Sequence, residues 1–221
     1  YKNQVHQRNL GFKYVKSKYV MQMDDDVFFQ KDTLKKLFLA IQNKTEKNVI
    51  GPIYILEKKN LNKIKIFNFV KNIYHHLICA SKWGDHKYGK ITKLTISFTV
   101  NSNFKQKKLI ETEWLPGGCI IFNKKLLYIN NIKYPFKGKS FCEDIFHSLQ
   151  RKKRNIKHHV LTAAFANHKI TSDLSIKSFL MEMRVRNTLL KKNIFIKLRF
   201  FIWASFEMMI RLIKKFNYLL F

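Results

Sequence analysis

Residues 19–26 read YVMQMDDD: five residues that alternate as in a β-strand, then three adjacent carboxylates. The alternation starts at Lys18, and the predicted strand runs directly into the acidic triplet. Asp32 and Thr33 then give a helix start signal, and apolar residues after them fall on one face of a helix. Before the strand, residues 5–16 mix apolar and basic side chains at roughly helical spacing. The order helix, strand, acidic turn and helix predicts an α/β protein.

The rest of the chain continues this alternation of strands and helices. We predict strands at residues 49–56, 91–100, 118–122 and 160–166, and helices at 123–129, 141–153 and, as a pair, 175–216. No Pro/Gly/Ser-rich linker divides the sequence. We therefore expect one catalytic domain over residues 1–174 and a helical tail over residues 175–221.

The composition is strongly basic: 43 Lys and Arg stand against 14 Asp and Glu, a formal charge of +29. Such a chain attracts polyanions, whether nucleic acid, an anionic membrane or a phosphorylated substrate. Lys far outnumbers Arg, and Asn, Ile and Phe are abundant, which is typical of AT-rich coding sequences. Part of the excess charge therefore says little about a partner, and the nucleic-acid interpretation loses weight.

Three cysteines, Cys79, Cys119 and Cys142, are widely spaced and odd in number. They form neither a C-x-x-C pair nor a disulfide framework, which favours a reducing, cytoplasmic setting. No signal peptide is visible, and the most apolar stretch, residues 200–210, is short and interrupted by a glutamate. We therefore expect no membrane-spanning segment.

The triplet Asp24, Asp25 and Asp26 needs positive charge nearby, because adjacent carboxylates repel one another and are costly to bury unpaired. Mn²⁺ or Mg²⁺ would supply that charge, since both prefer hard carboxylate oxygens and are commonly shared with substrate phosphates. Ligands of α/β sheets bind beyond the carboxyl ends of strands, where this triplet is predicted to lie. The alternative is a solvated acidic turn that nearby lysines neutralise.

A second acidic pair, Glu143 and Asp144, falls at the predicted start of a helix. The positive end of the helix dipole favours a charged carboxylate there, so the pair could supply a general base near neutral pH. Ordinary capping of the first helical turn is the alternative interpretation.

An ordered series of short segments resembles the inverting family 2 glycosyltransferases, which have the GT-A fold. The segments are QRNLG at 7–11, YVMQMDDD at 19–26, DTL at 32–34, WLPGG at 114–118, FCED at 141–144, LQR at 149–151, ANH at 166–168 and VRN at 185–187. The resemblance implies a Rossmann-like mixed sheet flanked by helices, with further helices at the C-terminus. In that family a strand, a helix and another strand open the fold and bind the nucleobase, and we expect this chain to lack them.

The resemblance also implies an activity: transfer of a sugar from a nucleoside-diphosphate donor to a hydroxyl of a saccharide or lipid-linked acceptor, with inversion. Asp24 and Asp25 would bind the donor, and Asp26 would be the first metal ligand, assisted by Asp24. Asp144 would be the general base, with Glu143 as its supporting neighbour. The metal would neutralise charge that develops on the leaving diphosphate.

Five further residues acquire roles from the resemblance, each with a simpler alternative. His168 would complete the metal shell or touch the diphosphate, or would only be a hydrogen-bonded histidine at a strand end. Gly117 and Gly118 would let the backbone approach the bound sugar, or form an ordinary tight turn. Trp114 would stack on an acceptor sugar ring, or be a half-buried aromatic. Arg8 would meet the donor phosphates, or lie on the surface of a basic helix.

Residues 194–221 alternate apolar clusters with Lys and Arg, a pattern that could lay a helix on an anionic membrane surface. With a lipid-linked acceptor, this predicts a protein held peripherally at the inner face of the cell membrane. The alternative is a helix packed on the domain with a solvated basic face.

Two rival functions explain some of these features. A basic nucleic-acid-binding protein, or a two-metal nuclease at the acidic clusters, accounts for the charge. It accounts poorly for the WLPGG turn and the apolar terminal helix, and no RNA- or DNA-binding signature is present, so we do not expect nucleic acid as a partner. The other rival is an inactive scaffold at the membrane.

Overall fold

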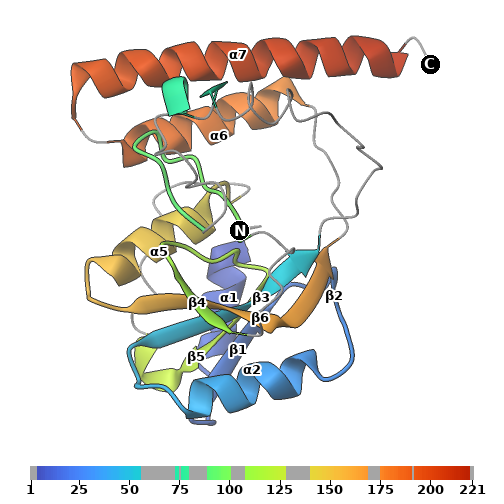
Figure 1. Cartoon of the computed structure of the whole chain (residues 1–221), viewed down its shortest axis with the longest axis vertical. Helices are drawn as coiled ribbons and strands as arrows, with labels where there is room; N and C mark the ends of the chain where they lie inside the picture. The colour runs from blue at the N-terminus through green and yellow to red at the C-terminus, as the bar shows by residue number, and fades with distance from the viewer. Residues whose placement is uncertain are drawn as a thin grey trace. The chain divides into compact units, whose positions relative to one another are not determined.

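The computed structural model describes residues 4–55, 73–74, 76–79, 89–100, 108–127, 140–168, 175–190 and 192–219. Helices and strands alternate along the chain, as predicted (Figure 1). In order they are α1 (Gln4–Phe12), β1 (Tyr19–Met23), β2 (Val27–Phe29), α2 (Thr33–Gln42), β3 (Asn48–Ile55), β4 (Leu109–Thr112), β5 (Cys119–Asn123), the 3₁₀ helix η2 (Lys124–Leu126), α5 (Glu143–Lys152), β6 (Lys157–His168), α6 (Ile176–Leu189) and α7 (Ile194–Leu219).

The strands form one mixed sheet in the order β1-β5-β3-β6-β2, with β4 paired to β6. Strands β3 and β6 run parallel, whereas the other described pairs are antiparallel. Helix α2 covers one face of the sheet by burying Leu37 and Ile41 (Figure 1). Phe12 at the end of α1 packs against the opposite face. The predicted α/β sheet flanked by helices is therefore confirmed.

Residues 91–100 do not form the predicted strand. Thr95 has a left-handed backbone with a φ of 60°. The hydroxyl of Thr92 accepts hydrogen bonds from the backbone N–H groups of Leu94 and Ile96. These contacts fold the segment into a turn, so its alternating sequence pattern does not produce an extended strand.

The segment predicted as a helix at residues 123–129 begins with the 3₁₀ helix η2. The side chain of Asn123 caps it, as expected, by accepting a hydrogen bond of 3.0 Å from the backbone N–H of Lys125. Residues 128–129 lie outside the described residues.

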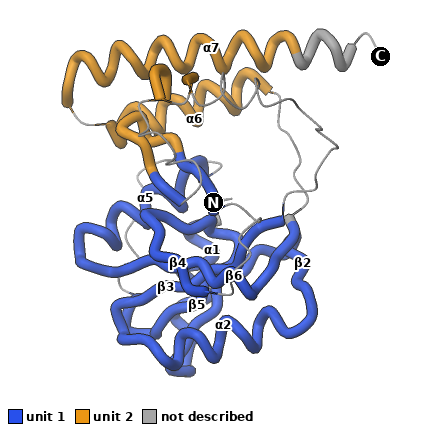
Figure 2. Tube along the Cα trace, in the orientation of Figure 1, with its two compact units in different colours: residues 1–61, 85–90, 97–170 blue, residues 62–84, 91–96, 171–221 orange. Residues whose placement is uncertain are grey.

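The chain divides into two compact units, coloured separately in Figure 2. Unit 1 comprises Tyr1–Leu61, Asp85–Lys90 and Ser97–Ile170, and it holds the sheet with α1, α2 and α5. Unit 2 comprises Asn62–Gly84, Ile91–Ile96 and Thr171–Phe221, and it holds the two predicted C-terminal helices, α6 and α7. Among the described helices, none combines the length and apolar character needed to cross a bilayer.

Candidate active site

Four distant segments of unit 1 meet beyond the end of β1. Strand β1 pairs antiparallel with β5, so its last residue, Met23, lies opposite the first residue of β5, Cys119. This pairing sets the acidic triplet beside the glycine turn that precedes β5. The backbone N–H of Asp24 donates to the carbonyl of Gly118 at 2.9 Å. The side-chain amide of Gln22 donates to the carbonyl of Gly117 at 2.8 Å, which fixes the turn further.

Arg8 of α1 joins the two acidic clusters that the sequence predicts. One guanidinium nitrogen donates to Asp24 Oδ1 at 2.6 Å, and the other donates to Glu143 Oε1. Burial alone would lower the pKa of Arg8, but the charges and hydrogen bonds of Glu143 and Asp24 raise it above its ordinary value. The arginine therefore stays charged, and it ties the end of β1 to the start of α5.

Helix α5 begins at Glu143, as predicted, after Cys142 in a left-handed conformation. Glu143 is buried, and its second carboxylate oxygen has no hydrogen-bond partner within the described part of the chain. Burial raises the pKa of Glu143; Arg8 opposes this shift, and the neighbouring Asp144 adds to it. Asp144 is less buried, so it is the member of the pair that is better exposed to a substrate.

The glycine turn packs tightly against the carboxylates. A Cβ on Gly117 would lie 3.3 Å from Glu143 Oε1 and 3.7 Å from Asp144 Cβ. A Cβ on Gly118 would lie only 2.9 Å from the hydroxyl of Tyr54 and 3.4 Å from Asp24 Oδ2. Glycine is thus required at position 118 by the approach of a neighbouring side chain.

Tyr54 of β3 lies at the candidate site, although no pattern in the sequence selects it. Its hydroxyl is buried and has no hydrogen-bond partner among the described residues. Burial, followed by the nearby Cys119, Asp24, Asp144 and Asp26, raises its pKa, so the phenol stays neutral. Tyr54 is therefore a neutral polar group held among the site carboxylates. No local pattern distinguishes it from other strand tyrosines.

Asp25 and Asp26 are exposed at the turn between β1 and β2. Strand β2 pairs with the end of β6, and Val27, the residue after Asp26, lies opposite His168. The sheet thus brings the backbone of His168 next to the acidic turn. The side chain of His168 lies outside the part of the structure that is described.

Within the described residues, no group of three or more His, Cys, Asp or Glu side chains is arranged to hold a metal ion. The donor chemistry nevertheless suits a hard cation. Asp24 and Asp26 supply carboxylate oxygens at the end of a strand, and Arg8 donates to Oδ1 of Asp24. Oxygens of this kind are the ligands that Mg²⁺ and Mn²⁺ share with phosphates.

Trp114 lies at the start of the turn and is only 7% exposed. Its indole N–H donates to the carbonyl of Phe98 at 2.9 Å, and its own carbonyl accepts from Thr112 at 3.0 Å. These contacts hold the aromatic ring inside unit 1. Stacking of Trp114 on an acceptor sugar stays a prediction.

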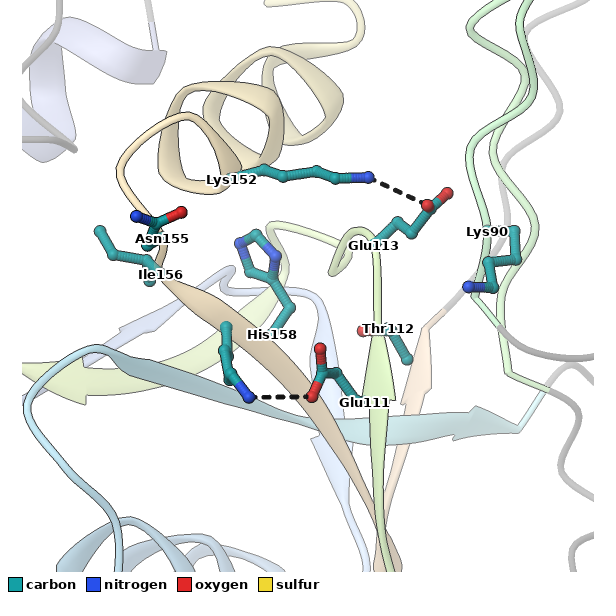
Figure 3. A pocket seen from close by; sticks show the side chains of 9 residues that line it. Lys90, Glu111, Thr112, Glu113, Lys152, Asn155, Ile156 and His158 are labelled. Carbon is teal, nitrogen blue, oxygen red and sulfur yellow. Dashed lines mark hydrogen bonds and ion pairs between the residues drawn. The ribbon is translucent and has the colours of Figure 1, made fainter.

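A separate pocket of about 400 Å³ lies at the start of β6 (Figure 3). The acidic site lies at the other end of that strand, where His168 pairs with Val27. Ion pairs join Lys152 to Glu113 at 3.0 Å and Lys157 to Glu111 at 3.6 Å in its wall. His158 also lines the pocket. The pocket contains none of the predicted site residues, and its two acids, Glu111 and Glu113, are each paired with a lysine, so we do not assign the sugar donor to it.

This arrangement, a mixed α/β sheet whose acidic site lies beyond a strand end, is the one that the resemblance to GT-A glycosyltransferases implies. The model of "Glycosyl transferase family 2" matches residues 2–127, more than half of the chain, and the chain belongs to that family. The predicted family membership is therefore confirmed, and it favours a transferase over a nucleic-acid-binding protein.

A solved structure, "Crystal structure of GalNAc-T7 with UDP, GalNAc and Mn2+", matches with a TM-score of 0.53 and 10% sequence identity. The match covers 84% of this chain and 34% of that one, so the chain spans about a third of the length of that protein. At this identity the likeness concerns the fold alone, and it supports the GT-A architecture. A search of curated proteins gave no significant match.

Proposed function

We propose that this protein transfers a sugar from a nucleoside-diphosphate donor to a hydroxyl of a saccharide or lipid-linked acceptor, with inversion at the anomeric carbon. The observation that carries the proposal is the contact of Arg8 with both Asp24 and Glu143. It unites two acidic clusters that lie far apart in the sequence into one site. The proposed donor-binding cluster and the proposed base would then act on a single substrate.

Asp24, Asp25 and the backbone of Gly117 and Gly118 would bind the donor. The guanidinium of Arg8 would favour the diphosphate electrostatically while it orients Asp24. Asp26 and Asp24 would hold Mn²⁺ or Mg²⁺, a choice supported by their oxygen donors and by the Mn²⁺ named with the GalNAc-T7 structure. When bound, the ion neutralises charge on the leaving diphosphate. His168 is the proposed further ligand, because β6 brings its backbone beside the triplet.

Asp144 is the proposed general base. As the acceptor oxygen forms its bond to the anomeric carbon, Asp144 takes the hydroxyl proton, and the electron pair of the breaking bond leaves with the diphosphate. Glu143 is poorly suited to this role because it is buried and engaged by Arg8. Its contact with Arg8 would instead fix the start of α5 and so orient Asp144. Trp114 is the proposed acceptor contact.

We expect a cytoplasmic protein held peripherally at the inner face of the cell membrane, where a lipid-linked acceptor would be available. The basic composition and the apolar C-terminal helix support this.

The test is Asp144→Asn, assayed with the sugar nucleotide that the parent uses. General base catalysis typically contributes about 10² to 10⁴ in rate, so kcat should fall by that order while the donor Kd hardly changes. Glu46→Gln, an exposed acid on the same unit, should keep the parental kcat. A capping role would instead lower stability by about 1 kcal/mol and leave turnover intact. A well-folded Asp144→Asn protein with parental turnover would rule the mechanism out.

A further inference from the structure

Helix α7 has two apolar faces. One packs in the core of unit 2, where Phe200 and Trp203 are buried against Phe179 and Met183 of α6. Glu207 points to this packed side, since it accepts a hydrogen bond of 3.1 Å from the hydroxyl of Tyr74. An ordinary surface helix would present polar side chains on its opposite face.

The opposite face of α7 is apolar and exposed. We define the outer stripe of α7 as six residues at successive spacings of three or four, which therefore lie on one side of the helix. They are Phe195 (77% exposed), Leu198 (60%), Ile202 (43%), Phe206 (43%), Met209 (49%) and Ile213 (53%). Contiguous exposed apolar surface of this kind marks an interaction site.

The charges beside the outer stripe indicate which partner fits it. Residues 194–213 contain a single acid, Glu207, which is engaged on the packed side, so the outer stripe carries no acidic side chain. Of the three basic side chains in this range, Arg199 donates to the backbone carbonyls of His76 and Leu77, and Arg211 contacts Glu182 of α6, which leaves Lys197. Lys197 is exposed between Phe195 and Leu198. An apolar stripe without acidic side chains, beside an exposed lysine and on a chain with a formal charge of +29, suits the boundary between the headgroups and acyl chains of an anionic bilayer. A helix that is only packed on the domain should expose a basic, solvated face. The exposed outer stripe of α7 is apolar instead.

We propose that the outer stripe of α7 binds the surface of an anionic membrane, with the helix lying in the plane of the interface. The packed face stays on α6, so only the outer stripe enters the lipid. Lys197 meets the anionic headgroups. This inference concerns unit 2 alone and does not depend on the transfer reaction, so either proposal can fail without the other.

The test is flotation of the full chain with vesicles of phosphatidylcholine, with and without phosphatidylglycerol. The parent should float with the anionic vesicles and less with the neutral ones. Phe195→Glu/Leu198→Glu should weaken binding to anionic vesicles by about tenfold or more, because it puts charge on two exposed apolar side chains that would enter the lipid. Acidic side chains near the start of a helix interact favourably with the helix dipole, so this variant should keep α7 helical.

The matched control is Tyr14→Glu/Leu39→Glu on unit 1, which changes charge equally at residues that are 82% and 49% exposed. It should bind vesicles like the parent. Equal binding by the parent and the stripe variant, or no flotation of the parent, would overturn the proposal. So would sedimentation of the vesicle-free parent as a dimer that the stripe variant dissociates, because the stripe would then be an interface between two copies.

Discussion

Replacing Arg8 by Met should strongly destabilise unit 1. The guanidinium is only 15% exposed and neutralises Asp24 and Glu143, whose side chains are 22% and 11% exposed. Removing one partner from a buried ion pair usually costs about 3 to 5 kcal/mol, because the remaining charge is left uncompensated. Since all three groups keep some contact with solvent, we expect the lower end, about 3 kcal/mol. That is a large fraction of a typical folding free energy.

The cost should also depend on pH in a defined direction. The pKa of Glu143 is already raised in the folded protein, and loss of Arg8 should raise it further. A carboxyl whose folded pKa is raised contributes stability below its unfolded pKa, and this contribution is lost as pH rises through the folded pKa. The penalty of Arg8→Met should therefore be largest at neutral pH and smaller at about pH 5, because a carboxyl with a raised pKa takes up a proton more readily as the pH falls.

Urea unfolding followed by tryptophan fluorescence at both pH values measures these free energies. Lys125→Met is the control, because it removes an exposed ion pair to Glu46, with side chains 71% and 51% exposed, and should cost less than about 1 kcal/mol. A cost for Arg8→Met as small as that of the control would refute the reasoning. A penalty that grows as pH falls would refute the role assigned to Glu143.

Three more variants probe the surroundings of the site. Burial lowers the pKa of His147 to about 3, whereas the histidine of the unfolded chain takes up a proton near its ordinary pKa of 6.5. The free energy of unfolding of the parent should therefore decrease as the pH falls below about 6.5. His147→Gln should reduce the decrease in unfolding free energy between about pH 7.5 and 5 by about 2 kcal/mol. Acid unfolding curves of both proteins check this, and parallel curves would contradict it. Gly118→Ala should cost about 1 to 3 kcal/mol, because its Cβ would lie 2.9 Å from the Tyr54 hydroxyl. Gly117→Ala should cost less in the same urea titration, and a reversed order would contradict the packing.

The sequence predicted the elements that carry the site because each has a strong local pattern. Residues 18–23 alternate before the acidic triplet, and β1 follows them closely. Helix α2 begins at Thr33 as expected, although not by the expected means. Asp32 makes no side-chain cap, and the hydroxyl of Thr33 donates to the carbonyl of Phe165 at 2.9 Å. The predicted start of the helix is thus correct, but a contact with a distant residue stabilises it instead of a local side-chain cap.

Contacts between distant segments could not be predicted from local patterns. The sequence around Arg8 does not indicate that its side chain contacts Asp24 and Glu143. Helical spacing predicts on which face of the helix Arg8 lies, but it does not predict which distant residues that face contacts. The buried hydroxyl of Tyr54 depends on a turn that lies far along the chain at Gly118. Strands β2 and β4 were not predicted for another reason. They have three and four residues, which are too few to show the alternation of apolar and polar side chains that indicates a strand.

The sequence predicted the amphipathic character of α7 but not which of its apolar residues are exposed. Alternating apolar and basic clusters indicate an amphipathic helix, but they do not say which apolar residues are used inside the protein. That choice follows from the packing of Phe200 and Trp203 in the core of unit 2, which leaves Phe195 and Leu198 outside.

The central claim is a donor site built on the acidic triplet, and calorimetric titration with nucleoside diphosphates, with and without Mn²⁺, tests it most directly. Mn²⁺ should raise the affinity of the parent for at least one nucleoside diphosphate, because the diphosphate oxygens complete the metal shell. Asp26→Asn should lose on the order of tenfold or more of that affinity. Asp32→Asn, whose left-handed backbone suits asparagine, should bind like the parent. Equal metal and nucleotide binding by Asp26→Asn and the parent would contradict the assignment.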